Sequence, residues 1–316
     1  MIKYYKKVGS QFEESDASDV DWINIEPPYD HNELEKIATQ YNIPLDLLTD
    51  SLDIDERSRY EKEDNLKFLL VNTPVLNQEK GENGPIYITA PIGIILLEGK
   101  VITISSVDNP IINRFEKGYV KITDAVNEVA FTLKILQQTV FEFLKCLKKL
   151  NLRRTLIERE LYNSSRNKEL QQLLRIEKSL VYFVNSISDN GLLNQKIKRV
   201  DFLKIRNDED LIDLFEDILI DNGQALEMAN VHTNILSSTM EAYASIISNN
   251  MNVFIQRLTV ITIILMVPTL VASFYGMNLD HLPLKGHPFA FYFIILISIL
   301  GGLALVWFFG RRKDAL

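Results

Sequence analysis

The clearest pattern along the chain is a pair of long apolar segments near its C-terminal end. Residues 258–277 form a run of 20 residues without a charge, and residues 288–310 form a run of 23. At a helical rise of ~1.5 Å per residue, either segment is long enough to cross the ~30 Å hydrocarbon core of a bilayer. The pattern therefore predicts two transmembrane helices, joined at residues 278–287 by a loop that allows only a tight hairpin.

Upstream of these segments the apolar residues are spaced in two different ways. In residues 1–118, short apolar runs alternate with turn signals, which is typical of a small α/β domain. From residue 124 onwards, apolar residues recur every three or four positions in long stretches without proline, which predicts long helices. The expected strands are residues 2–8, 21–25, 66–71, 86–97 and 101–105, and the expected helices are residues 33–41, 45–52, 124–163, 167–188 and 208–257.

These segments together predict an α+β fold that ends in a membrane hairpin. The last soluble helix has no strong stop signal before the first apolar run, so we expect one helix to continue into the membrane. The predicted order is an N-terminal cytoplasmic α/β domain at residues 1–118, long antiparallel cytoplasmic helices at 119–207, a stalk helix continuing into the first transmembrane helix at 208–277, an outer loop at 278–287, the second transmembrane helix at 288–310 and a basic cytoplasmic tail at 311–316.

The distribution of charge orients this hairpin. The whole chain has a net charge of −8, and the charged residues after position 257 are Asp280, Lys285, Asp314 and the basic run at 311–313. Arg257 and the basic run flank the two spans on one side, whereas Lys285 is the single base of the loop. The positive-inside rule therefore places both chain ends in the cytoplasm and the loop outside, in the cell membrane.

Several classes of protein are disfavoured by the composition. Cys146 is the single cysteine, which excludes an intramolecular disulfide framework or a cysteine metal cluster. No apolar run follows Met1, so we expect no secretory signal peptide. The acidic balance without a basic stripe argues against nucleic acid as a partner. No catalytic triad motif or nucleotide-binding loop is present, so we expect neither an enzyme nor an organic cofactor.

One face of the first apolar segment carries candidate pore residues. They follow one another at spacings of 4, 4, 3 and 4 and therefore share a helical face: Leu258, Thr262, Met266, Thr269 and Ser273. Rings of hydroxyls and thioethers from several subunits could line a narrow neutral pore with apolar constrictions. The alternative is that these hydroxyls bond back to carbonyls of their own helix, as is common in membranes.

The outer end of this segment reads Tyr275-Gly276-Met277-Asn278, and here the sequence resembles the CorA family of divalent-cation channels. The Gly-Met-Asn triplet, placed at the end of the first of two C-terminal membrane helices, is the signature of that family. The resemblance continues upstream through residues 246–252, Leu258-Thr259 and Pro268-Thr269, and it reaches the N-terminal domain at residues 22–25.

This resemblance implies a homopentamer in a lipid bilayer, with the long helices forming a cytoplasmic funnel that leads to the pore. It implies that Gly276, Met277 and Asn278 form the selectivity filter, with a ring of Asn278 side chains meeting the hydrated ion. Mg²⁺ dehydrates reluctantly, and amide oxygens can accept hydrogen bonds from its bound waters. Carried over by position, Asn252, Leu258, Met266 and Thr269 fall at pore-lining places of the family.

The resemblance also implies a regulatory site for cytosolic Mg²⁺ between neighbouring subunits. The segments at residues 48–52 and 215–218 resemble the family's two gating segments and nominate Asp50 and Asp217 as ligands. Carboxylates are the ligands that hard cations take, and bound metal would neutralise facing acidic surfaces. The alternative is that both are ordinary solvated acids, since each lies among other acidic residues.

The outer loop departs from the family pattern. Many relatives carry glutamates there, whereas in this chain Asp280 is the single acid available to attract cations at the mouth. His281 and His287 leave Ni²⁺, Co²⁺ or Zn²⁺ open as further ions, although ordinary interfacial loop residues are the simpler interpretation.

The sequence thus favours a passive Mg²⁺ channel, with cobalt or nickel as further permeant ions. Two alternatives stay open. One is a zinc transporter of the same superfamily that uses a proton gradient, and the other is a membrane-anchored metal sensor or scaffold.

Overall fold

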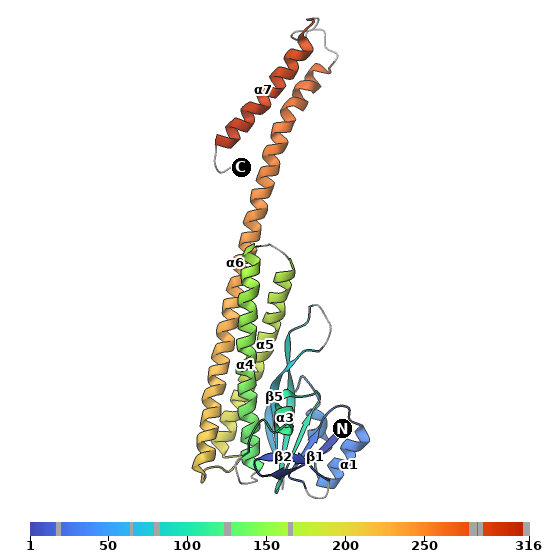
Figure 1. Ribbon diagram of the computed structural model, residues 1–316, viewed down its shortest axis with the longest axis vertical. Coiled ribbons are helices and arrows are strands. Elements are labelled where there is room, and N and C mark those ends of the chain that lie inside the picture. Colours follow the sequence, from blue (N-terminus) through green and yellow to red (C-terminus); the bar gives the residue numbers. More distant parts are fainter. Residues whose placement is uncertain are drawn as a thin grey trace. The chain divides into compact units, whose positions relative to one another are not determined.

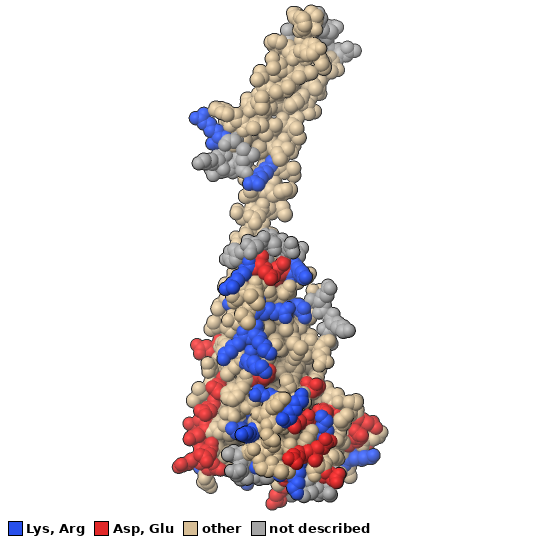
Figure 2. Space-filling view, in the orientation of Figure 1, with Lys and Arg blue, Asp and Glu red and all other residues tan. Residues whose placement is uncertain are grey.

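The computed structural model describes residues 1–16, 20–63, 66–78, 83–122, 128–163, 167–277, 283 and 287–311. The chain divides into two compact units, Met1–Met240 and Glu241–Leu316. Charged side chains are spread over the first unit, whereas the described part of the second unit is almost uncharged (Figure 2).

The first unit is built on a seven-stranded mixed sheet (Figure 1). Its strand order is β2-β1-β3-β7-β6-β5-β4, in which β3 and β7 run parallel and the other neighbouring pairs run antiparallel. The central strands are buried on both faces, which explains their nearly continuous apolar sequences. The strands are β1 (Ile2–Val8), β2 (Gln11–Glu14), β3 (Trp22–Ile25), β4 (Arg59–Glu63), β5 (Leu66–Leu76), β6 (Tyr87–Leu97) and β7 (Lys100–Ser105).

Helices α1 (His31–Tyr41) and α2 (Leu45–Asp50) cover one face of this sheet. Asp30 caps α1 by accepting the backbone N–H of Asn32, and Asn42 ends it in the left-handed region with φ 52°. The core on this face joins apolar residues of both helices to alternate residues of the strands: Leu34, Ile37, Leu47, Leu48, Ile23, Ile25, Phe68, Leu70, Ile102 and Ile104. Strand alternation therefore decides which side chains meet α1 and α2.

The opposite face of the sheet is covered by α3 (Pro110–Glu116), α4 (Glu128–Asn163) and α5 (Asn167–Val200). Trp22 of β3 points to this side, where its ring lies 5.3 Å from that of Phe131 in α4. Its Nε1 donates to Thr103 Oγ1 at 2.8 Å, so the polar atom of this fully buried side chain is satisfied. This face is therefore locked by aromatic packing together with hydrogen bonds between elements.

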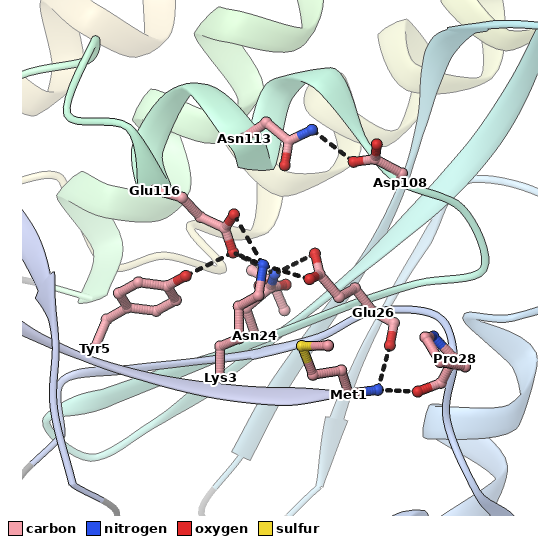
Figure 3. A network of polar contacts seen from close by, with 10 residues as sticks. Met1, Lys3, Tyr5, Asn24, Glu26, Pro28, Asp108, Asn113 and Glu116 are labelled. Carbon is pink, nitrogen blue, oxygen red and sulfur yellow. Dashed lines mark hydrogen bonds and ion pairs between the residues drawn. The ribbon is translucent and has the colours of Figure 1, made fainter.

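A polar network fastens α3 to the first strands (Figure 3). Glu116 of α3 accepts hydrogen bonds from Tyr5 Oη at 2.8 Å, Asn24 Nδ2 at 3.0 Å and Lys3 Nζ at 3.3 Å. Lys3 also pairs with Glu26. Burial, together with the hydrogen bond to Glu116, raises the pKa of Tyr5, so this phenol stays a neutral donor.

The N-terminal half of α6 (Glu209–Tyr275) completes the first unit. Its buried residues recur at helical spacing on one face: Phe215, Ile218, Asn222, Ala225, Ala229 and Leu236. Asn222 Nδ2 donates to the carbonyl of Ile187 in α5 at 3.1 Å. A Cβ on Gly191 would come within 2.8 Å of Asn222 Nδ2, so a glycine is needed where the two helices approach.

The second unit contains the C-terminal part of α6 and helix α7 (Ala290–Arg311), both long and apolar enough to cross a membrane. From residue 258 onwards, the α6 residues that are at least partly buried are Val260, Ile264, Val267, Pro268, Val271 and Tyr275, and those of α7 include Ile294, Ser298, Gly301 and Leu305. A Cβ on Gly301 would meet Val267 Cγ1 at 3.2 Å. A small residue thus lets the two helices pack closely, as in many membrane helix pairs.

The expected α+β architecture with two C-terminal spans is confirmed, and the errors in detail are local. β2, β4 and α3 were not predicted from the sequence, and α5, which was expected to end at residue 188, runs to Val200. β2 and β4 are charged strands at the two edges of the sheet, where charge protects against edge pairing and hides the apolar alternation. Asn190 and Gly191, just beyond the expected end, stay helical in the structure, where Gly191 lies close to Asn222 of α6.

Candidate functional site

The candidate pore residues lie on an open face of α6 in the second unit. Leu258 is 53% exposed and Met266 is 59% exposed, and Thr262, Thr269 and Ser273 are exposed as well. The buried or partly buried residues of this part of α6, among them Val260, Ile264 and Val271, are displaced from the stripe by about half a turn at ~3.6 residues per turn, and Val267 of the same face lies against Gly301 of α7. The stripe therefore points away from α7 and is free to face other copies of the chain.

The threonine hydroxyls of this stripe bond back to their own helix. Thr262 Oγ1 donates to the carbonyl of Leu258 at 2.8 Å, and Thr269 Oγ1 donates to that of Leu265 at 3.0 Å. With its proton committed, each hydroxyl oxygen presents lone pairs outward and can act only as an acceptor. An acceptor suits the water protons of a hydrated cation, so back-bonding and pore lining are compatible.

Asn252 lies on the same helix, upstream of the stripe, and its side chain is exposed. It falls six residues before Leu258, which places it about 80° around the helix from the centre of the stripe. Asn252 is therefore at the edge of the candidate pore face.

The predicted filter begins where α6 ends. The helix stops at Tyr275, after which the backbone N–H of Gly276 donates to the carbonyl of Ala272 at 2.9 Å. A Cβ on Gly276 would lie 3.2 Å from that oxygen, so glycine allows a tight end to the helix. Met277 is 49% exposed in the single chain. Asn278, Asp280 and His281 lie outside the described residues.

The structure places Asp50 at the end of α2, in an ion pair that the sequence did not suggest. Its Oδ2 lies 2.7 Å from Nη2 of Arg59 at the start of β4. Arg59 also contacts Glu56 through Nη1 at 2.5 Å and Glu61 through Nε at 2.6 Å. Burial alone would lower the pKa of Arg59, but the hydrogen bonds to Glu61 and Asp50 outweigh it and raise the pKa.

Asp217 is exposed on α6, two positions after the buried Phe215. Within one chain it does not meet Asp50, because α2 covers one face of the sheet whereas α6 belongs to the helices on the other side (Figure 1). Among the described residues, no group of three or more His, Cys, Asp or Glu side chains could hold a metal ion. A single chain thus offers each of the two nominated ligands separately, as a site shared between subunits requires.

A buried asparagine clamp positions the segment that carries Arg59. Pairing of β4 with β5 begins at Arg59 and Leu70, so the β5 backbone at Asn72 has no strand partner on that side. The side chain of Asn190 in α5 replaces it, accepting from the N–H of Asn72 at 3.1 Å and donating to its carbonyl at 2.8 Å. Ser58, next to Arg59, donates to the same Asn190 at 2.7 Å.

Sequence reasoning missed Arg59 and Asn190. A signal for Arg59 was available, because Arg59 and Glu61 alternate within a short charged segment and thus share one face of a strand. Asn190 gave no such signal, since its partners Ser58 and Asn72 lie far away in the sequence.

Known proteins resemble this chain over nearly its whole length. The profile of the family described as CorA-like Mg²⁺ transporter protein matches residues 17–312. The cobalt/magnesium transport protein CorA of Methanocaldococcus jannaschii is 27% identical over 294 residues, which cover 92% of this chain and 90% of that protein. The complete structure of the CorA magnesium transporter from the same organism matches with a TM-score of 0.79 at 25% identity, covering 100% of this chain and 98% of its own.

A more distant likeness exists to the cytoplasmic domain of ZntB from Vibrio parahaemolyticus. It covers 78% of this chain and 98% of that domain, with a TM-score of 0.59 and 9% identity. At this identity the likeness extends to the fold alone.

Proposed function

Since this chain belongs to the CorA family of Mg²⁺ transporter proteins, we propose that it is a passive uptake channel for divalent cations, with Mg²⁺ as its principal cargo. The relative from Methanocaldococcus jannaschii is named as a cobalt/magnesium transporter, and Co²⁺ is therefore included among the permeant ions, with Ni²⁺ as a further one. The chain acts as a multi-pass protein of the cell membrane with both ends in the cytoplasm.

The observation that supports this function most directly is the open stripe on α6. Its hydroxyl oxygens are acceptors, and its apolar members Leu258 and Met266 lie between and beside them on the same face. A hydrated Mg²⁺ presents water protons, which acceptor oxygens can bind without stripping the water. Apolar rings at the same radius close such a pore by dewetting when it narrows.

Copies of the chain are needed to enclose this path, because one helix cannot surround an ion. We take the assembly to be a homopentamer with α6 of each subunit inside and α7 outside. The packing of α7 against the face of α6 opposite to the stripe supports this arrangement. Asn278 of each subunit then forms the outer ring, with Gly276 and Met277 shaping the end of the helix, and Asp280 adds negative charge at the mouth.

Uptake needs no chemical energy source. A divalent cation entering an inside-negative cell gains roughly 2 × 2.3 kcal/mol per 100 mV. Such a favourable flux must be shut when cytosolic Mg²⁺ is sufficient. We assign closure of the channel to Mg²⁺ bound between Asp50 of one subunit and Asp217 of its neighbour. When this Mg²⁺ is lost, the assembly loosens and the rings at Leu258 and Met266 widen.

The test is ion entry into liposomes that contain the purified full-length chain, at an imposed inside-negative potential. Mg²⁺, Co²⁺ and Zn²⁺ are compared, each with and without a pH gradient. Native protein is expected to pass Mg²⁺ without a pH gradient. This flux is expected to stop when Mg²⁺ is added on the side of the large domain. Asn278→Ala is expected to abolish passage, whereas Asn234→Ala, an exposed asparagine of α6 in the first unit, is the matched control.

Each other outcome has a definite meaning. Zn²⁺ entry that requires the proton gradient would replace this function by proton-coupled zinc transport. No flux of any ion would leave a membrane-anchored metal sensor as the better function. An unchanged metal dependence in Asp50→Asn and Asp217→Asn would refute the regulatory site but leave the pore intact.

A further inference from the structure

Arg59 stands at the centre of a three-carboxylate cluster that contains the nominated metal ligand Asp50. Each of its three nitrogens pairs with a different acid: Nη2 with Asp50, Nη1 with Glu56 and Nε with Glu61. The guanidinium also lies 5.7 Å from the centre of the ring of Phe68, a fully buried residue of β5. A cation is thus already present at the acid that the proposed regulatory site uses.

The carboxylates of this cluster remain within reach of solvent ions. The side chain of Asp50 is 42% exposed, and those of Glu56 and Glu61 are 33% and 38% exposed. One oxygen of Asp50 is committed to Arg59, while Oδ1 makes no hydrogen bond or ion pair with the described residues. A divalent ion approaching Asp50 therefore meets both a free oxygen and a neighbouring positive charge.

We propose that Arg59 is the internal counter-ion of Asp50, which competes with the divalent cation and so sets the Mg²⁺ concentration at which the channel closes. This inference rests on the regulatory role of Asp50 proposed above and adds the residue that tunes it. When metal binds Asp50, Arg59 releases that carboxylate and stays paired with Glu56 and Glu61. When metal leaves, Arg59 neutralises Asp50 again.

The geometry keeps the free-energy cost of this exchange of partners small. Because its three nitrogens have separate partners, Arg59 loses one ion pair in the exchange and is never left without a carboxylate. Its place over the ring of Phe68 and the strand pairing of β4 with β5 hold the guanidinium near the cluster throughout. A lysine could not divide its charge in this way, because it lacks the planar fork of the guanidinium.

The competition predicts shifts of opposite sign in two variants. Arg59→Gln removes a unit charge a few ångströms from the metal, so the closing Mg²⁺ concentration should fall on the order of tenfold. Glu61→Gln removes one of the alternative partners of Arg59 and lowers the local negative charge, so the closing concentration should rise. Arg59→Lys keeps the charge and should stay nearer to the native value than Arg59→Gln.

The matched control is Arg57→Gln. It makes the same change in net charge two residues away, and among the described residues Arg57 forms no ion pair. Its closing concentration should stay close to native. A general effect of net charge would move both arginine variants in the same way.

The experiment measures Mg²⁺ currents of the full-length channel while Mg²⁺ is titrated on the side of the large domain, together with Mn²⁺ binding to the same protein by electron paramagnetic resonance. Tighter Mn²⁺ binding in Arg59→Gln that is lost in the double variant with Asp50→Asn would support the inference. Equal closing concentrations in native protein, Arg59→Gln and Glu61→Gln would overturn it. If Asp50→Asn alone leaves closure unchanged, the regulatory site itself fails, which is a separate result.

Discussion

The two units of this chain bury their apolar residues in different ways. In the first unit Phe143 and Phe183 are fully buried, and their rings meet edge to face at 5.2 Å. In the second unit Leu265 is 64% exposed. In the most apolar stretches of α6 and α7, only 6% and 11% of the residues are buried within the chain. The first unit thus completes its core within one chain, whereas the second must bury its apolar surface against lipid and other subunits.

The two units also differ in how their side chains form hydrogen bonds. In the first unit side chains join separate elements, as Trp22 does with Thr103 and Asn190 with Asn72. In the second unit the hydroxyls of Thr259, Thr262, Thr269 and Ser298 all donate to carbonyls four residues earlier in the same helix. These four bonds survive when one helix shifts against another. The comparison teaches that one chain can combine a unit whose elements are fixed to one another with a unit whose helices can shift, by placing polar contacts between elements in the first and within a helix in the second.

The largest expected effect contrasts the two kinds of burial directly. Phe143→Ala removes a fully buried ring and should lower the free energy of unfolding by about 3–5 kcal/mol. Leu265→Ala, at an exposed position of the second unit, should leave thermal unfolding in detergent nearly unchanged. Circular dichroism on heating measures both variants. Equal losses would show that the second unit has a core of its own and would break the comparison.

The next effect concerns the close contact behind Asp50. A Cβ on Gly93 would lie 2.0 Å from Ser51 Oγ and 2.8 Å from Ile104 Cγ2, so Gly93→Ala must displace the end of α2. We expect a loss of about 1–3 kcal/mol and a changed metal dependence of closure. Gly223→Ala in α6 is the control, since nothing lies within 4 Å of its added Cβ and helix propensity favours alanine. A neutral Gly93→Ala would mean that α2 tolerates movement.

The smallest effect is a pH dependence of the first unit. Burial, and then the nearby Arg154, lower the pKa of His232 in α6 from its ordinary value of 6.5. The unfolded chain therefore takes up a proton before the folded chain does, and the free energy of unfolding should decline as the pH falls below 6.5. His232→Gln should reduce this decline, whereas His31→Gln, on the exposed surface of α1, should not. Denaturant titrations between pH 5 and 7.5 measure the difference, and identical slopes would contradict the assignment.

The sequence predicted what depends on long regular patterns. The two spans, the continuous α6 and the stripe at Leu258, Thr262 and Met266 follow from apolar runs and helical spacing, and the structure has the helices where these patterns require them. The CorA resemblance is confirmed by the family match over residues 17–312. The roles of Asn278, Asp50 and Asp217 stay predictions.

What the sequence could not supply are contacts between distant segments. Asn190 lies more than a hundred positions from Ser58 and Asn72, and no local pattern links them. Arg59 lies within a charged edge strand whose apolar alternation is weak, so its partners at Asp50 and Glu56 appear only when α2 and β4 are placed together. Such contacts depend on tertiary packing, which overrides local preference.

The most direct test of the central claim is whether the open stripe of α6 lines the ion path. The native Cys146 is a poor target for thiol reagents, because burial raises its pKa to about 12. A positively charged thiol reagent should therefore block Mg²⁺ current in Thr262→Cys. The same reagent should not change the current of Val267→Cys or of Leu296→Cys. Val267 lies against Gly301, and Leu296 lies on the exposed face of α7. Block at Val267→Cys or Leu296→Cys with an unaffected Thr262→Cys would contradict the account.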